Sequence, residues 1–467
     1  MVILMIDVVI QNFSISDDIT LRQQQNILRR VSFVDGIMTA NDCIKRSGII
    51  ARAYYDGLWG VATSSTINER SAKELLDKSM NNAKLLSSFS TSNKKRTYLP
   101  YSEQSIPAVD FLQIDYIDIE QSMIIDYAKK IDQYISRTYK KICTRRVMLY
   151  VDGIEKYIRT PFKNLLLSST IKRSCLYVEM GAYDLKGHIT SVSKKIGVPY
   201  EMGKWHTLIE NSKELTEQLH EALMDKTHAQ DVCKGVFPCI LHPNVAGILA
   251  HEAIGHNVEA DIVEKGSFAS GFLGKQIASE KVSISDFAHT AFSAPAGLPL
   301  FVDDEGTVCR DVDIIKGGKL LGYLHDRESA AHYQVTPSGN ARAYLAFDEP
   351  IIRMRNTAFH PGNDTLADMI ASIDNGYFLL SSGGGQADVN GEFIFTIDLG
   401  YQIRNGKILG AIRDTTISGN AIEILSSISM ISNDFQWDIT GLCGKFQSMI
   451  LATGGPYIKC DLFLGKE

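Results

Sequence analysis

The feature of this chain that most constrains its fold is a short apolar segment that carries two histidines and a glutamate. After Pro243-Asn-Val-Ala-Gly-Ile-Leu-Ala250 the sequence continues His251-Glu252-Ala-Ile-Gly-His256. Imidazole and carboxylate groups are costly to bury in an apolar helix unless they bind a ligand or each other. One interpretation accounts for all three residues: the histidines hold a zinc ion, and the glutamate is the general base for a metal-bound water.

The spacing of the two histidines makes a demand on the backbone. The common zinc peptidase helix reads His-Glu-x-x-His, with its ligands one turn apart. His251 and His256 are five residues apart, and such side chains diverge by about 140° on a regular α-helix. Both reach one metal only if the helix widens to a π-type turn or breaks, and we expect Gly255 to permit this. On spacing alone, a helix end with one core and one solvated histidine fits equally well.

Further motifs follow this segment along the chain. They are Val302-Asp-Asp-Glu-Gly306, Gly322-Tyr-Leu-His-Asp-Arg327, Arg353-Met-Arg-Asn-Thr357, Ser382-Gly-Gly-Gly-Gln-Ala-Asp-Val-Asn-Gly-Glu-Phe393 and Gly441-Leu-Cys-Gly-Lys445. Together with His-Glu-Ala-Ile-Gly-His-Asn-Val-Glu-Ala-Asp at 251–261, they resemble the pattern of the TldD/PmbA family, zinc peptidases with a His-Glu-x-x-x-His signature. A weaker similarity at Ile49–Thr63 extends the resemblance over nearly the whole chain.

A catalytic zinc site needs a third protein ligand and a position open to water. From the residues alone, Glu259 and Asp261 qualify because they closely follow the second histidine, and Cys443 qualifies because it lies in a glycine-rich loop. The family resemblance favours Cys443, since the matching family cysteine is a zinc ligand. Glu259 or Asp261 would then orient the histidines. A residue that the family carries before Gln447 is missing here, which alters the loop after Cys443.

Two further motifs could contribute to substrate binding or catalysis. Ser382-Gly-Gly-Gly-Gln386 lacks the lysine and hydroxyl residue of a phosphate-binding loop, so it does not predict nucleotide binding. Gly384 and Gly385 would instead let a peptide backbone approach a strand edge, and a tight turn is the alternative. His325 could donate a hydrogen bond to an oxyanion during amide hydrolysis, although such a histidine is more often a structural residue.

Length and local patterns predict an α+β protein, because 467 residues exceed what one core usually holds. Residues 1–95 and 96–228 are expected to form two α/β subdomains, and residues 229–467 a β-rich catalytic domain with the metal-binding helix embedded in it. Helices are expected at 21–31, 68–86, 114–135 and 212–225. Hairpins are expected at Asp56-Gly57 and Asp152-Gly153, and a linker at 87–96.

Composition narrows the setting in which the protein works. The net charge of −6 provides no basic surface for nucleic acid. The apolar start, Met1–Ile10, lacks the basic region of a signal peptide and is expected to be a short strand. No apolar run is long enough to span a bilayer. The eight scattered cysteines contain no CxxC pair, which predicts reduced and mostly buried thiols in a cytoplasmic protein.

These observations predict a zinc-dependent peptidase with His251, His256 and Cys443 as ligands and Glu252 as general base. The family resemblance implies unfolded peptides as substrates. It also implies a homodimer, or a heterodimer with a PmbA-like subunit that lacks the metal motif. Two alternatives remain: a zinc amidohydrolase acting on another amide, and a regulatory or binding subunit whose metal is structural.

Overall fold

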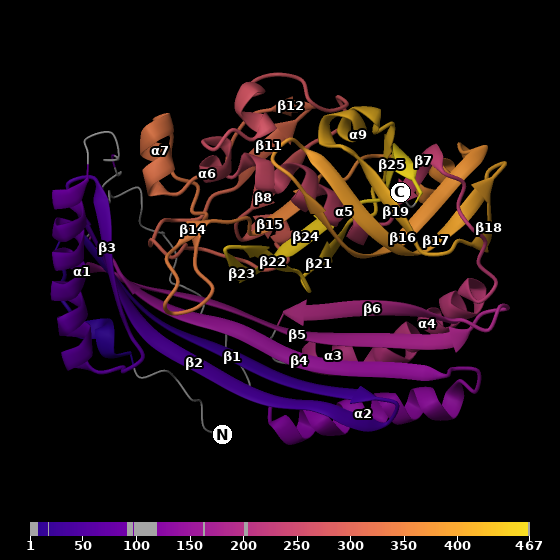
Figure 1. Cartoon of the computed structure of the whole chain (residues 1–467), viewed down its shortest axis with the longest axis horizontal. Helices are drawn as coiled ribbons and strands as arrows, with labels where there is room; N and C mark the ends of the chain where they lie inside the picture. Colours follow the sequence, from indigo (N-terminus) through magenta and orange to yellow (C-terminus); the bar gives the residue numbers. More distant parts are fainter. Residues whose placement is uncertain are drawn as a thin grey trace.

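The computed structural model describes residues 8–16, 18–90, 97, 119–161, 164–199 and 204–465. Helices make up 25% and strands 44% of the structure, which confirms the predicted α+β class. Figure 1 shows two layers: a sheet of long N-terminal strands below, and the C-terminal half of the chain above it. The functional site lies between these layers, so their packing decides its shape.

The N-terminal layer is one antiparallel sheet in the order β3-β2-β1-β4-β5-β6. Its strands are β1 (Ile19–Val34), β2 (Ile37–Tyr55), β3 (Leu58–Ser64), β4 (Thr144–Arg159), β5 (Leu166–Tyr183) and β6 (Ile189–Pro199). The pairing of β1 with β4 joins the first two predicted subdomains in a single sheet. The division of the chain into three domains remains a prediction.

Helices cover the N-terminal sheet. They are α1 (Glu69–Phe89), α2 (Gln121–Thr138), α3 (Lys204–Glu210) and α4 (Ser212–Lys226), and a 3-10 helix, Val9–Asn12, precedes β1. The predicted helices at 68–86 and 212–225 are thus confirmed. The helix expected at 114–135 begins at Gln121, and residues 114–118 lie outside the described part. In α2, Ile124, Ala128, Ile131 and Ile135 form an apolar stripe that packs on the sheet.

Two predictions in this half are wrong. Residues 21–31 form the central strand β1 instead of a helix. Their leucine, arginine and glutamine content suits a helix, but two of the buried side chains, Arg22 and Gln24, have partners in the C-terminal half. Gln24 Nε2 donates to the Tyr344 carbonyl at 2.7 Å, and Arg22 Nη2 donates to the Asp348 carbonyl at 2.7 Å. The predicted hairpin at Asp152-Gly153 lies inside β4, where Asp152 pairs with Arg173 on β5. The Asp56-Gly57 hairpin is confirmed between β2 and β3.

Three smaller expectations have mixed outcomes. Residues 1–7 of the predicted first strand lie outside the described residues, and its end forms the 3-10 helix. In the predicted linker, α1 continues to Phe89, and residues 91–96 are again not described. All eight cysteines are free thiols, as expected, but only Cys175, Cys239, Cys309 and Cys460 are buried.

The C-terminal half contains two large sheets. The first has the order β12-β11-β8-β15-β24-β21. Its strands are β8 (Ile284–Phe287), β11 (Val312–Lys316), β12 (Lys319–Leu320), β15 (Asn356–Phe359), β21 (Gln436–Asp438) and β24 (Ala452–Gly455). The helix that leads into the histidine motif, α5 (Pro243–Leu249), packs against β24, where Gly247 approaches Thr453 and Gly454 closely.

The second sheet has the order β16-β7-β25-β19-β17-β18, with β20 beside β25. Because β16 also pairs with β17, the strands close into a ring. They are β7 (Gly235–Leu241), β16 (Asn375–Ala387), β17 (Glu392–Arg404), β18 (Lys407–Ala411), β19 (Thr415–Asn420), β20 (Met430–Ile431) and β25 (Ile458–Leu464).

Short elements complete this half of the chain. The helices are the π-helix η5 (Ala250–Gly255), η6 (His256–Val258), α6 (Ala260–Val263), η7 (Phe268–Gly271), α7 (Arg327–Tyr333), α8 (Leu366–Ala371) and α9 (Ala421–Ser427). The two-stranded ribbons are β9 (Thr290–Ala291) with β10 (Ala294–Pro295), β13 (Ala341–Arg342) with β14 (Ile351–Ile352), and β22 (Leu442–Lys445) with β23 (Gln447–Ile450).

Buried ion pairs fasten the two layers together. Asp304 forms ion pairs with Arg22 at 3.0 Å and with Lys156 at 2.6 Å, and Arg52 pairs with Glu305 at 2.5 Å. Removing one partner of such a pair leaves an uncompensated buried charge, which is strongly destabilising. The layers are therefore expected to behave as one unit. Over the described ranges, none of the helices combines the length and apolar character needed to cross a membrane.

The contact between α1 and β3 provides a test of the fold. A Cβ atom added at Gly60 would lie 2.1 Å from the Ala83 nitrogen and 2.2 Å from the Ser79 carbonyl oxygen, both backbone atoms of α1. We predict that Gly60→Ala lowers the free energy of unfolding by about 2–3 kcal/mol, because α1 must move away from the sheet. Urea denaturation measures this. Gly410→Ala, with nothing within 4 Å of the added atom, is the control; equal midpoints would contradict the packing.

Candidate metal centre

The backbone of the histidine motif widens as its spacing requires. After α5, residues Ala250–Gly255 form a π-helix, in which the His256 N–H donates to the His251 carbonyl five residues earlier. This wider turn brings side chains five residues apart onto one face, and the two imidazole rings lie 4.7 Å apart. The π-type turn expected from the sequence is confirmed.

Gly255 has a different role from the expected one. Its φ is −57°, an ordinary helical value, so the turn does not depend on the conformational freedom of glycine. A Cβ atom here would lie 2.1 Å from the sulfur of the buried Met354. Gly255 is thus required for the close packing of the π-helix against Met354.

Three donor side chains converge at this turn. The ligand atoms of His251, His256 and Cys443 all lie within 4.8 Å of one another, and within the described ranges no other group of three or more such residues does so. His256 Nε2 is 3.1 Å from Cys443 Sγ. Neither nitrogen of the buried His251 has a hydrogen-bond partner among the described residues. Because a buried polar group normally has a partner, a ring nitrogen of His251 without one fits a ligand to a metal ion.

A carboxylate fixes the second histidine. Glu259, fully buried, lies 3.0 Å from His256 Nδ1, which leaves Nε2 directed at Cys443. Lys445 contacts Glu259 at 3.0 Å and Asp261 at 2.8 Å. Metal-bound histidines commonly donate their other ring N–H to a carboxylate in this way. Glu259 therefore orients a candidate ligand. The contact of Asp261 within this group is with Lys445.

The two histidines differ in their protonation. Burial lowers the pKa of His251 well below its ordinary value, and His256 and Arg353 act in the same direction. Burial also lowers the pKa of His256, but Glu259 and Cys443 outweigh it and raise the value to about 10. His256 must therefore lose a proton when a metal binds, because a ligating imidazole is neutral.

The third donor lies on a short ribbon. Cys443 is in β22, which pairs with β23 through Cys443–Met449 and Lys445–Gln447. Phe446, at the apex, has a φ of 59° and is 88% exposed. The ribbon thus turns at one aromatic residue in the left-handed region. Arg353, fully buried, donates to the Cys443 carbonyl at 3.0 Å and to the Gln447 carbonyl at 2.8 Å.

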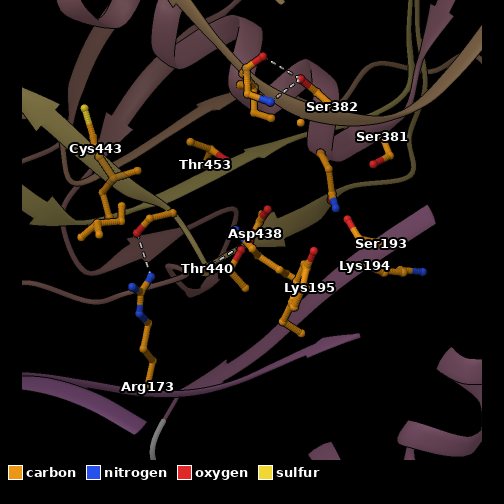
Figure 2. A pocket seen from close by; sticks show the side chains of 18 of the residues that line it. Arg173, Ser193, Lys194, Lys195, Ser381, Ser382, Asp438, Thr440, Cys443 and Thr453 are labelled. Atoms are coloured by element: carbon orange, nitrogen blue, oxygen red, sulfur yellow. Dashed lines mark hydrogen bonds between the residues drawn. The ribbon is translucent and has the colours of Figure 1, made fainter. Parts of the chain in front are cut away.

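The site opens into a cavity of about 1220 Å³ between the two layers. His251, Glu252 and Cys443 line it from one side, and strands of the N-terminal sheet line it from the other. Figure 2 shows Ser381 and Ser382 of β16 and Lys194 and Lys195 of β6 around the same space. Burial raises the pKa of Glu252, and Glu259 adds to this effect. A carboxyl group with a raised pKa beside the donors suits proton transfer.

The remaining predicted residues are divided between the cavity and the core. Gly384 and Gly385 line the cavity on β16, where Gly384 has a φ of 129°. His325 does not line it. Its Nδ1 lies 3.1 Å from Ser329 Oγ, and burial lowers its pKa to about 4. Its position therefore gives no support to a role at an oxyanion. Arg353 and Lys445 lie within the motifs that carry the family resemblance, but nothing in the sequence indicated that they anchor the cysteine ribbon.

Comparisons with known proteins place this chain among its relatives. The family model described as PmbA/TldA metallopeptidase C-terminal domain matches residues 234–463, and that of domain 1 matches residues 21–83. A zinc metalloprotease TldD homolog of Saccharolobus solfataricus is 29% identical over 415 residues, 88% of each chain. A metalloprotease of Methanocaldococcus jannaschii is 30% identical over 428 residues, 88% of this chain and 89% of the relative.

A solved structure extends the agreement to the fold. The crystal structure of TldE from Thermococcus kodakarensis superposes with a TM-score of 0.73 over 97% of both chains, at 16% identity. A site with the donors of a zinc centre thus lies on a fold shared with that protein. The chain belongs to the TldD/PmbA family, and its curated relatives at about 30% identity have metalloprotease names.

The contact of Glu259 with His256 leads to a prediction. We expect Glu259→Gln to weaken zinc binding by about ten- to a hundredfold, because the amide holds the imidazole less firmly than the carboxylate does. Competition with a chromophoric chelator measures the zinc Kd. Asp261→Asn is the matched control, since it also contacts Lys445 but not His256, and its Kd is expected to stay close to that of the wild type. Equal losses in both variants would contradict the role of Glu259.

Proposed function

We propose that this chain is a zinc-dependent peptidase that hydrolyses peptide bonds of unfolded peptides. The observation that carries the proposal is the convergence of the His251, His256 and Cys443 donors beside Glu252 at the wall of a large cavity. Three protein donors are the usual number for a catalytic zinc, which keeps one position open. The metalloprotease names of the relatives support the same reaction class.

The chemistry divides between the metal and Glu252. A zinc ion held by the three donors would polarise the scissile carbonyl and lower the pKa of the attacking water. Glu252 accepts the proton of that water and delivers it to the leaving amine. Its burial-raised pKa favours both transfers, because a carboxylate with a higher pKa is a better base and its acid form persists closer to neutral pH.

The cavity suits an extended peptide. Residues 377–379 of β16 pair with β7 on one side, whereas Ser381–Ala387 pair only with β17 among the described strands. Ser381–Gly385 line the cavity, so the second edge of this segment is available to a peptide backbone. We propose that Gly384 and Gly385 contact the substrate main chain there. A folded protein is too bulky to present its backbone inside such a space.

The alternatives differ in their metal site and their partners. A structural metal would need a closed set of four ligands, and the described cluster has three members. A zinc enzyme acting on another amide would share all of the features above, so only the relatives' names favour a peptidase. For the partner we propose a second copy of this chain or a PmbA-like subunit, and light scattering of the purified chain tests the first.

The central prediction concerns Glu252. We expect Glu252→Gln to abolish peptide cleavage while the zinc content stays at one ion per chain, because the amide cannot accept the proton but none of the three donors is lost. Mass spectrometry of an unfolded peptide measures cleavage, and elemental analysis measures the metal.

The wild-type chain treated with a chelator and then resupplied with zinc serves as the control, and its activity should disappear and return. Cleavage by Glu252→Gln at the wild-type rate would overturn the assignment of the base. If neither chain cleaves, the structural-metal alternative or the need for a partner subunit gains support.

The proposed strand edge makes a separate prediction. Methylation of alternate backbone amides removes donors that pair with a strand edge, without changing the side chains. We expect a peptide methylated in the pairing register to show a kcat/KM at least tenfold below that of the same peptide methylated in the other register. Equal values for the two peptides would show that the edge of β16 does not bind the substrate main chain.

A further inference from the structure

We propose that Arg173, on the N-terminal sheet, is a positioning residue for the metal ligand Cys443. The inference rests on the metal centre proposed above and concerns a residue outside the C-terminal family domain and outside every motif that carries the resemblance. It means that the N-terminal sheet contributes to the metal site as well as enclosing the cavity.

The guanidinium group of Arg173 is shared between the two layers of the molecule. On β5, it binds Asp152 of the neighbouring strand β4 through Nε at 2.8 Å and Nη2 at 3.0 Å. Its Nη1 donates to the carbonyl oxygens of Ile439 and Gly441, the latter at 2.8 Å. The side chain is 2% exposed. Asp152 thus fixes the planar guanidinium group, and the remaining nitrogen, Nη1, points at the chain just before Cys443.

The segment that Arg173 holds leads directly into the ligand strand. Gly441 precedes β22, and Cys443 is the second residue of that strand. Figure 2 shows Arg173 extending from the N-terminal sheet toward this segment, with Cys443 beyond it. Thr440 and Asp438 close a turn through a 2.7 Å hydrogen bond from the Thr440 N–H to Asp438 Oδ1. A displacement at Gly441 would therefore be transmitted along the backbone to the cysteine.

Apolar contacts hold the same segment against the N-terminal sheet. Ile439 packs in a buried cluster that includes Ile154 of β4 and Ile171 of β5. Gly197 of β6 makes room for it, since a Cβ atom there would lie 2.8 Å from Ile439 Cγ1 and 3.0 Å from Thr440 Cγ2. The segment therefore rests on three neighbouring strands of the sheet.

The ligand ribbon needs this support because no larger sheet sets its position. Among the described strands, β22 pairs only with β23, and an isolated two-stranded ribbon is at best marginally stable. Arg353 and Lys445 hold it from the C-terminal half. Arg173 holds its entry from the N-terminal half. The two histidines, in contrast, share one continuous helical segment, which sets their positions without a contact from the N-terminal sheet.

The test compares two conservative variants of buried arginines that both link the layers. Arg173→Lys keeps the positive charge beside Asp152 but loses the fork that reaches two carbonyl groups. Arg52→Lys, which faces Glu305, alters the layer contact without touching residues 439–445. Each full-length chain is loaded with Zn²⁺ to measure the Kd by chelator competition, and with Co²⁺ to record the thiolate charge-transfer band of Cys443.

We expect Arg173→Lys to raise the Zn²⁺ Kd roughly tenfold and to weaken the Co²⁺ thiolate band, while Arg52→Lys leaves both unchanged. Because Arg173 acts through the cysteine, Arg173→Lys should have no further effect on the Kd in a Cys443→Ser background, a double-mutant cycle that a general loss of stability does not mimic. Should Arg173→Lys fail to fold, Gly197→Ala displaces the same segment while leaving Arg173 in place, and it should weaken the same band.

The outcomes separate this inference from the proposed function. If the wild-type chain shows no thiolate band with Co²⁺, both the metal centre and the role of Arg173 fall. If the wild-type band is present but Arg173→Lys keeps the wild-type Kd, or loses as much affinity in the Cys443→Ser background, the metal centre stands and the positioning role is overturned.

Discussion

The candidate metal site depends on one backbone hydrogen bond, from the His256 N–H to the His251 carbonyl five residues earlier. A regular α-helix would direct these imidazoles to different faces, whereas the π-turn brings the rings within 4.7 Å. Met354 packs closely on this turn, and a Cβ atom at residue 255 would lie 2.1 Å from its sulfur. Two further contacts complete the site around the two histidines. Glu259 orients His256, and the β22–β23 ribbon brings Cys443 to His256.

The two layers of the molecule are interdependent through buried charges. Arg22 and Lys156 converge on Asp304, and Arg173 holds the segment before Cys443. Such pairs stabilise a structure little more than apolar contacts would, but they require specific partners and so favour one arrangement of the layers. The cavity between the layers therefore has walls of fixed relative position, with the donors on one wall and the N-terminal sheet on the other.

Local patterns predicted part of the fold well. The helices at 68–86 and 212–225 and the hairpin at Asp56-Gly57 depend on nearby residues, and the structure confirms them. Residues 21–31 were mispredicted because Arg22 and Gln24 have partners about 320 residues away, in the C-terminal half. Asp152-Gly153 was mispredicted as a turn because a cross-strand arginine satisfies the aspartate.

The sequence by itself determined the chemistry of the site: which donors are present, that their five-residue spacing requires a wider helical turn, and that a glutamate lies beside them. These properties depend on residue types and on covalent spacing. Only the tertiary structure decided how Cys443 meets the histidines across 187 residues, and that Glu259 rather than Asp261 supports His256. It also decided that Arg173, on the N-terminal sheet, donates to the Gly441 carbonyl just before Cys443. Contacts between distant segments depend on how sheets pack, and no local pattern encodes that packing.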